Sequence, residues 1–269
     1  MDTLFRNSRR KLSQGLLFWR EAGQGIPVIL LHGAWNDSSQ WVPLIDLLSD
    51  NFHCLAPDLL GFGESDNPNI HYSIDLQVEC LAEFLTALKL EKVFLVGHSL
   101  GGWIATSYAL KHPEQVHGLV LLSPEGVKIE KQEKQWQRMQ RVAKLSPFIF
   151  KVLKLLSPLI KIVGLQEKVQ QYLQLRNLML QYPTGCQLLF DRKPPEVEAE
   201  LLQNQLSLIE FPVLILQGGK DTAEAIAKSQ IYAQSLPNSE FKMVAHAGND
   251  LPESCVGVIA EDIREYIKK

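Results

Sequence analysis

Short apolar runs recur along the chain, and most of their residues are branched aliphatic or aromatic. Turn-forming residues bound these runs, which is typical of strands buried on both faces of a parallel sheet. The predicted strands are Pro27–Leu31, Phe52–Ala56, Val93–Val96, Gly118–Leu122, Pro212–Leu216 and Glu240–Val244.

Segments with helical periodicity lie between these runs. Apolar residues recur every three or four positions in Ile74–Leu88 and in Cys255–Ile267, and Trp103–Leu110 follows a pair of glycines. Such spacing places the apolar side chains on one face of a helix. The alternation of strand and helix predicts an α/β fold with a doubly wound, mostly parallel sheet.

The alternation stops between residues 125 and 206, where only helical patterns are found. The predicted helices are Ile129–Lys144, Pro147–Val163 and Gln166–Gln181, and residues 191–200 lead back to the sheet. We therefore expect a helical insertion over residues 125–206, within a core formed by residues 1–124 and 207–269.

The second predicted helix of the insertion carries three lysines on one face, at Lys151, Lys154 and Lys161. Three lysines on one face usually indicate a solvated surface, which is the interpretation we favour. Docking of this face on an anionic membrane surface is the alternative.

Composition narrows the classes of function. The chain has 269 residues, enough for a sizeable core, and 46% of them are hydrophobic, as in ordinary soluble proteins. Its formal net charge is −3 and no basic stripe dominates, so we expect no nucleic-acid partner. The basic N-terminal segment lacks the long apolar stretch of a signal peptide, which favours a cytoplasmic location.

The four cysteines are widely separated, at Cys54, Cys80, Cys186 and Cys255. They form neither a C-x-x-C pair nor a spacing typical of a zinc site. We therefore expect reduced, mostly buried thiols, and neither a metal nor a cofactor.

The segment "VFLVGHSLGGW" carries the strongest chemical signal. It places the pattern G-x-S-x-G, from Gly97 to Gly101, directly after a predicted strand and before a helix. A sharp turn in this context lifts the serine hydroxyl above the end of the sheet and requires small neighbouring residues. Ser99 is therefore the predicted nucleophile.

The segment "LLHGAWNDSSQW" supplies a second part of the predicted site. Its backbone turns after a strand, so the N–H groups of Ala34 and Leu100 are predicted to form an oxyanion hole. Such a pair of donors stabilises the negative charge that develops on a carbonyl oxygen. His32 and Asp58, which lie nearby in the pattern, are expected to be structural hydrogen-bonding residues.

The segment "FPVLILQGGKDTAE" places Asp221 a few residues beyond a late strand. In the chain order Ser…Asp…His, the carboxylate that orients the base belongs at this point. Asp221 is therefore the predicted catalytic acid, and a solvated loop aspartate is the alternative.

Together these segments resemble the α/β-hydrolase superfamily over nearly the whole chain. The resemblance rests on the His-Gly loop, the loop "PDLLGFGES", the elbow at Ser99, the strand before Asp221 and the C-terminal helix. It implies a helical cap over the active site, as in the capped branch of esterases, lipases and C–C hydrolases. Epoxide hydrolases and haloalkane dehalogenases of this fold carry Asp where this chain has Ser99, which argues against both.

The resemblance also reveals one departure. The family's catalytic His follows the last strand, and its position corresponds to Asn249 in "AHAGNDLP". A carboxamide is not appreciably basic, so it cannot take the proton of Ser99 as an imidazole does. His246, three residues earlier, is the alternative base if the loop rearranges; otherwise it is a loop histidine near the rim. The sequence leaves open whether Asn249 is natural or introduced.

These residues predict a serine hydrolase acting on a small apolar acyl or aryl ester, or on a related acyl compound. The chain is expected to be weak or inactive because Asn249 occupies the position of the base. C–C bond hydrolysis, thioester hydrolysis and a non-hydrolytic lyase are alternatives among enzymes. A ligand-binding protein that has given up turnover is the alternative outside them, and the sequence does not specify the oligomeric state.

Overall fold

A computed structural model describes residues 4–129 and 166–268 of the chain. Its centre is an eight-stranded sheet in the order β1-β2-β4-β3-β5-β6-β7-β8. The strands are β1 (Arg6–Lys11), β2 (Leu16–Ala22), β3 (Ile26–Leu31), β4 (Phe52–Pro57), β5 (Val93–His98), β6 (Val116–Leu122), β7 (Val213–Gly218) and β8 (Ser239–Val244). The pairs β1–β2 and β2–β4 are antiparallel and the other pairs are parallel, so the predicted doubly wound, mostly parallel sheet is confirmed.

All six predicted strands are present as β3 to β8. The sequence did not predict β1 and β2. The sequence of β1, RNSRRK, has no apolar residue, because this strand lies at the edge of the sheet and five of its six residues are exposed. An edge strand need not be apolar, so the hydrophobic pattern gives no sign of it.

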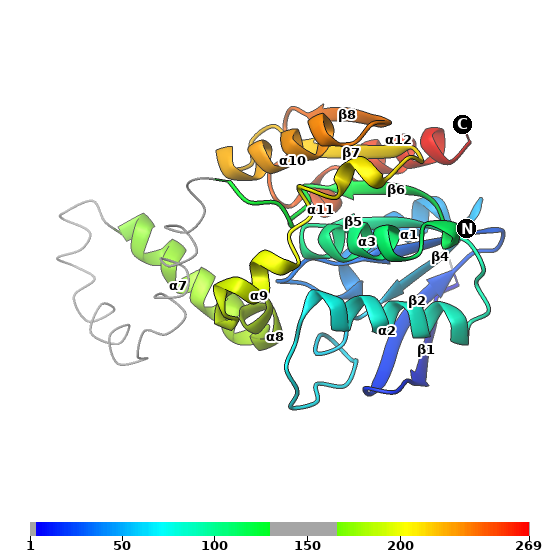
Figure 1. Ribbon diagram of the computed structural model, residues 1–269, viewed down its shortest axis with the longest axis horizontal. Helices are drawn as coiled ribbons and strands as arrows, with labels where there is room; N and C mark the ends of the chain where they lie inside the picture. Colours follow the sequence, from blue (N-terminus) through cyan, green and yellow to red (C-terminus); the bar gives the residue numbers. More distant parts are fainter. Residues whose placement is uncertain (1–3, 130–165, 269) are drawn as a thin grey trace.

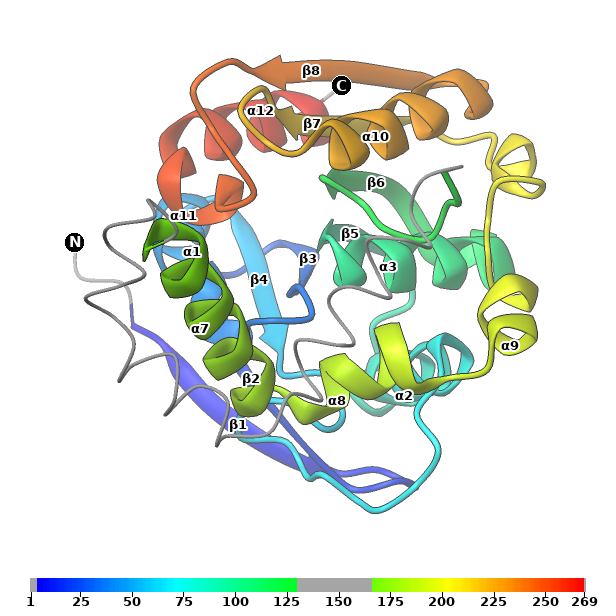
Figure 2. The same cartoon turned by 90° about the vertical axis from the view of Figure 1, so that its left-hand side faces the viewer.

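Helices cover both faces of the sheet (Figures 1 and 2). They are α1 (Val42–Leu48), α2 (Ile74–Ala87), α3 (Leu100–Lys111), α10 (Ala223–Ser235), α11 (Leu251–Ser254) and α12 (Val256–Lys268). Residues Ile29 and Leu31 of β3 pack with α2, α3 and α10 in one apolar cluster, whereas Val28 and Leu30 pack with α1 and α12 in a second. Burial on both faces explains why this strand is apolar at every one of these positions.

Between β6 and β7 the chain leaves the sheet and forms helices. They are α7 (Gln166–Gln181), α8 (Pro183–Cys186) and α9 (Pro194–Ala199), and α7 has the bounds predicted from the sequence. Helix α9 lies within residues 191–200, where the sequence predicted only a link. Apart from Ile129, the predicted helices 129–144 and 147–163, with the three lysines of the second, lie outside the described residues.

In Figure 2, α7 and α8 lie in front of the sheet, at one end of its strands. The division into a core of residues 1–124 and 207–269 and an insertion of residues 125–206 stays a prediction. None of the helices in residues 4–129 and 166–268 combines the length and the apolar character needed to cross a membrane.

Candidate active site

Ser99 lies at the turn between β5 and α3. Its dihedral angles are φ 51° and ψ −112°, a combination that residues with a side chain rarely adopt. The Ser99 N–H donates to the Leu122 carbonyl at 3.0 Å. The Ser99 carbonyl accepts from the N–H groups of Trp103 at 3.2 Å and Glu125 at 3.1 Å. The turn is thus fixed on both sides at a helix N-terminus, which is the geometry of a nucleophile elbow.

The two glycines of the pattern allow α3 to approach the sheet. A Cβ atom on Gly101 would lie 2.1 Å from the carbonyl oxygen of Leu31, and one on Gly97 would lie 2.4 Å from the carbonyl oxygen of Gly101. No side chain fits in these spaces, so the backbones of β3, β5 and α3 cross in direct contact. Ser99 lies at this crossing.

The backbone that follows β3 passes beside Ser99. A Cβ atom on Gly33 would lie 3.5 Å from Cβ of Ser99. Ala34 comes next and is buried, and Leu100 is the first residue of α3, so its N–H has no acceptor within the helix. The two predicted oxyanion-hole residues therefore belong to segments that meet at Ser99, and their role as donors stays a prediction.

His32 and Asp58 make structural hydrogen bonds, as the sequence suggested. Nε2 of His32 accepts from the Leu59 N–H at 3.0 Å, so Nδ1 carries the proton and donates to the Gly33 carbonyl at 2.8 Å. Burial lowers the pKa of His32, and the ring is neutral. Asp58 accepts from two backbone N–H groups, at 2.6 and 2.7 Å.

Gln40 connects the loop after β3 to the elbow. Its side chain is buried; Oε1 accepts from the Gly33 N–H at 3.3 Å, and Nε2 donates to Nδ1 of His98 at 2.8 Å. The His98 proton is therefore on Nε2, which has no hydrogen-bond partner among the described residues, although the ring lies close to the backbone of Asn249. Burial lowers the pKa of His98 to about 4, so this ring is also neutral. Sequence reasoning missed Gln40, whose only signal was its place in the quoted segment.

The loop that carries Asp221 packs on the loop that follows β8. The Lys220 N–H donates to the Ala247 carbonyl at 2.9 Å. A Cβ atom on Gly218 would lie 2.4 Å from the carbonyl oxygen of Gly248. These contacts hold the loop of the predicted base against the loop of the predicted acid.

The Asp221 carboxylate is half-buried and held by its own loop. Oδ1 accepts from the Thr222 N–H at 2.7 Å, and Oδ2 accepts from Nε2 of Gln217 at 3.2 Å. Gln217 is buried in turn, and its Oε1 accepts from the Ser229 hydroxyl at 2.5 Å. The carboxylate therefore has a fixed orientation without a histidine partner.

Asn249 and His246 are both exposed. Within the described part of the chain, no hydrogen bond joins either side chain to Ser99 or Asp221. His246 lies in a turn closed by the Ala247 N–H and the Val244 carbonyl at 3.2 Å. The structure brings the three predicted catalytic loops together, and the individual roles of their residues stay predictions.

An aromatic surface lies next to the predicted oxyanion hole. A Cβ atom on Gly185, in α8, would lie 2.4 Å from the Ala34 carbonyl oxygen, so the backbone of α8 touches this loop. The rings of Trp35 and Phe190 stack with centroids 6.0 Å apart and an interplanar angle of 22°. Sequence reasoning singled out none of these contacts, because residues far apart in the chain make them.

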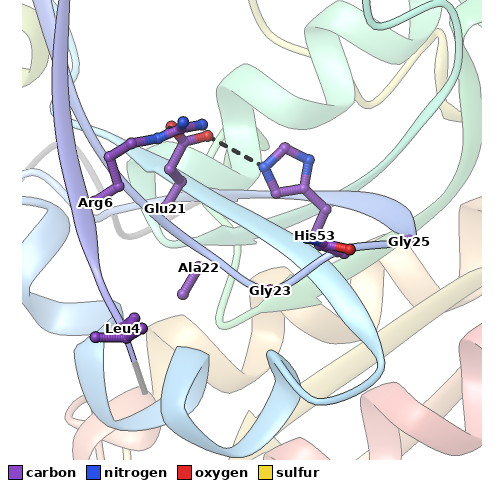
Figure 3. Close-up of a pocket in the computed structure, with 8 residues that line it drawn as sticks. Leu4, Arg6, Glu21, Ala22, Gly23, Gly25 and His53 are labelled. Carbon is purple, nitrogen blue, oxygen red and sulfur yellow. Dashed lines mark hydrogen bonds and ion pairs between the residues drawn. The ribbon is translucent and has the colours of Figure 1, made fainter. Parts of the chain in front are cut away.

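A separate cavity of about 470 Å³ is shown in Figure 3. It is lined by Leu4, Arg6, Glu21, Ala22, Gly23, Gln24, Gly25 and His53. His53 is near the start of β4, whereas Ser99 follows the end of the parallel strand β5, so this cavity is at the opposite end of the sheet. Glu21 already pairs with Arg6 and with His53, at 3.1 Å for the latter, and the cavity holds none of the predicted catalytic residues.

The four cysteines are free thiols; Cys54 and Cys80 are buried, and Cys186 and Cys255 are half-buried. Burial raises the pKa of Cys54 and Cys80 to about 12 and that of Cys186 to about 11. These three thiols are therefore protonated at neutral pH and are poor nucleophiles. Among the described residues, no cluster of His, Cys, Asp and Glu side chains has the arrangement of a metal site.

Comparisons with known proteins agree with the fold. A family model described as "alpha/beta hydrolase fold" matches residues 26–253. A monoacylglycerol lipase of Bos taurus is 27% identical over 235 residues, which cover 83% of this chain and 70% of the lipase. A 2-hydroxy-6-oxo-2,4-heptadienoate hydrolase of Pseudomonas putida is 38% identical over 117 residues, or 41% of each chain. The structure of a thermophilic esterase from Thermogutta terrifontis shares the fold, with a TM-score of 0.74, 24% identity and 98% of each chain covered.

The elbow glycine gives a test of the backbone crossing. Gly101→Ala places a methyl group against a backbone oxygen that cannot rotate away, so we expect a loss of about 1–3 kcal/mol or more of unfolding free energy. Gly257→Ala is the matched control, since a Cβ atom there meets no atom within 4 Å and α12 is a helix. Alanine should leave that variant unchanged or up to about 1 kcal/mol more stable. Urea unfolding measures both, and equal effects would contradict this account.

The buried neutral His98 predicts a dependence of stability on pH. Because its pKa falls from 6.5 to about 4 on folding, the unfolded chain binds the proton first as the pH decreases. The unfolding free energy is unaffected by this group above pH 6.5 and decreases as the pH falls from 6.5 to 4, by roughly 3 kcal/mol in total. His98→Gln should flatten this decrease in urea unfolding, whereas His71→Gln, at an exposed position, should not. The same pH dependence in both variants would refute the assignment.

Proposed function

This chain belongs to the α/β-hydrolase fold family, and on that basis we propose that it is a serine hydrolase for carboxylic esters or related acyl compounds. The observation that supports the proposal most strongly is the conformation of Ser99, with positive φ at the N-terminus of α3. Strained serines of this kind persist only where the surroundings hold them in place. We further propose that residues 125–206 act as a cap over the site.

In the proposed reaction, Oγ of Ser99 attacks the substrate carbonyl carbon and forms a tetrahedral intermediate. The N–H groups of Ala34 and Leu100 donate to its oxyanion. The proton leaves Ser99 for a base at position 249 and passes to the departing alcohol, and water then hydrolyses the acyl-enzyme by the same route. Asp221 orients the base.

Asn249 interrupts this route at each step that needs the base, in acylation and in hydrolysis of the acyl-enzyme. Its carboxamide can donate or accept hydrogen bonds but does not accept a proton near neutral pH. In another serine hydrolase, loss of the catalytic His costs roughly 10⁶ in rate, or about 8 kcal/mol of transition-state stabilisation. The chain should therefore retain substrate binding and turn over weakly or not at all. His246 as a replacement base requires a rearrangement of its turn.

The proposed substrate carries an apolar acyl or aryl group. The stacked rings of Trp35 and Phe190 beside Ala34 provide an apolar surface next to the proposed oxyanion hole. The names of the relatives span monoacylglycerol and a heptadienoate, so ester and C–C bond hydrolysis both belong to the proposal. Thioester hydrolysis and a lyase reaction are further options for the same nucleophile. We propose a cytoplasmic location and contact with neither nucleic acid nor a cofactor.

A second candidate is a ligand-binding protein without turnover, and Asn249 is the observation that favours it. The remaining elements argue for a disabled enzyme, because binding alone does not need a serine held in a strained conformation. A binding protein has the same pocket, but its function does not depend on the hydroxyl of Ser99. The two candidates therefore differ in the reactivity of one atom.

Restoring the base provides the first test. Asn249→His should raise the turnover of p-nitrophenyl esters by several orders of magnitude, since only the proton acceptor is missing. His246→Ala in that background should change the rate by less than about threefold, within the effect of an ordinary surface substitution. If the unmodified chain already hydrolyses these esters rapidly and loses that activity on His246→Ala, His246 is the base.

Labelling of Ser99 separates the two candidates. A phosphonylating reagent with a good leaving group needs little help from a base, so it should label the unmodified chain slowly, and faster as the pH rises. Intact-mass spectrometry should show one added group, absent in Ser99→Ala. Lack of an adduct after long incubation at high pH, with the fold intact, would favour the ligand-binding protein.

A further inference from the structure

We propose that Glu125, held by Lys228 and Tyr232 of α10, is a positioning residue that braces the nucleophile elbow. The inference rests on the proposed function, since it concerns the same serine. Neither Glu125 nor α10 belongs to the elbow motif or to the predicted catalytic residues.

The contact with the elbow is made by the backbone. The Glu125 N–H donates to the Ser99 carbonyl at 3.1 Å, next to the bond that the same carbonyl accepts from Trp103. Any movement of Glu125 therefore acts on the peptide group that follows the nucleophile. This peptide group also contains the Leu100 N–H, which is the proposed oxyanion donor.

Two side chains of α10 hold Glu125 in place. Nζ of Lys228 donates to Oε1 of Glu125 at 2.7 Å, and the Tyr232 hydroxyl donates to the Glu125 carbonyl at 2.5 Å. Lys228 and Tyr232 are buried. The Glu125 side chain is about 21% exposed, so water screens this ion pair only in part. Hydrogen bonds therefore hold both the N–H and the carbonyl of Glu125, and the ion pair with Lys228 holds its carboxylate.

The same helix also holds the predicted acid. Ser229, next to Lys228, donates to Gln217, and Gln217 donates to Oδ2 of Asp221. Helix α10 therefore bonds both to Glu125, which contacts the Ser99 carbonyl, and to Gln217, which contacts the Asp221 carboxylate. We infer that α10 fixes the distance between nucleophile and acid.

The test measures the reactivity and the mobility of the elbow separately. Lys228→Met removes the ion pair, Tyr232→Phe removes one hydroxyl, and Lys228→Arg restores the charge. Labelling of Ser99 by a phosphonylating reagent gives a maximal rate constant and an apparent reagent affinity. Hydrogen–deuterium exchange reports on the amides around Ser99, whether or not the serine reacts.

Lys228→Met should lower the maximal labelling rate about tenfold with an unchanged reagent affinity, because displacement of a reacting group by a fraction of an ångström has effects of this size. Exchange should accelerate at the elbow amides. Tyr232→Phe should move both readouts in the same direction, and Lys228→Arg should recover most of the rate. Tyr232→Phe decides the question if Lys228→Met does not fold.

Tyr266→Phe is the matched control. Its hydroxyl also donates to a backbone carbonyl, that of Pro212, at the end of β7 remote from Ser99. It should leave labelling and elbow exchange unchanged. Equal effects of Tyr232→Phe and Tyr266→Phe would overturn the proposed positioning role of Glu125. Unchanged hydrogen–deuterium exchange of the amides around Ser99 in Lys228→Met would overturn it as well. Failure of the unmodified chain and of Asn249→His to label would instead overturn the proposed function, and exchange would still decide the brace.

Discussion

The direct approach of α3 to the end of β3 is the constraint on which the candidate site depends. Because Gly101 has no Cβ atom, its backbone contacts the Leu31 carbonyl, and the chain must turn sharply at Ser99 to enter the helix. The resulting conformation costs of the order of 1–3 kcal/mol. The tightly packed core holds it, through hydrogen bonds to Leu122 on one side and Glu125 on the other.

Buried polar side chains then place the other loops around this fixed point. Gln40 links the loop after β3 to His98, and Gln217 links α10 to the Asp221 carboxylate. An unpaired buried amide costs about 1–3 kcal/mol, so these side chains have few alternative arrangements in the folded chain. Loops that would otherwise vary in position are thereby held at the same end of the sheet as Ser99.

The sequence predicted what is encoded locally. The strands β3 to β7 are mostly apolar and buried and were found, as was the half-buried edge strand β8 from its apolar residues Phe241, Met243 and Val244. The polar edge strand β1 was missed, and so was β2, although β2 is mostly apolar and buried. Ser99 was found because its glycines lie within a few residues of it. Gln40 and Glu125 were missed because their partners His98 and Lys228 are 58 and 103 residues away, and no spacing rule relates such residues.

The position of the proposed base differs from the rest of the site in one physical respect. The elbow depends on backbone contacts that a mutation cannot change without disturbing the core. The Asn249 side chain is exposed, and no hydrogen bond ties it to Ser99 or Asp221 within the described residues. Under the proposed mechanism, its identity therefore decides proton transfer and hardly affects folding. If position 249 is that of the base, as proposed, the chain can lose the base and keep a strained serine at the elbow, because separate parts of the structure determine these two properties.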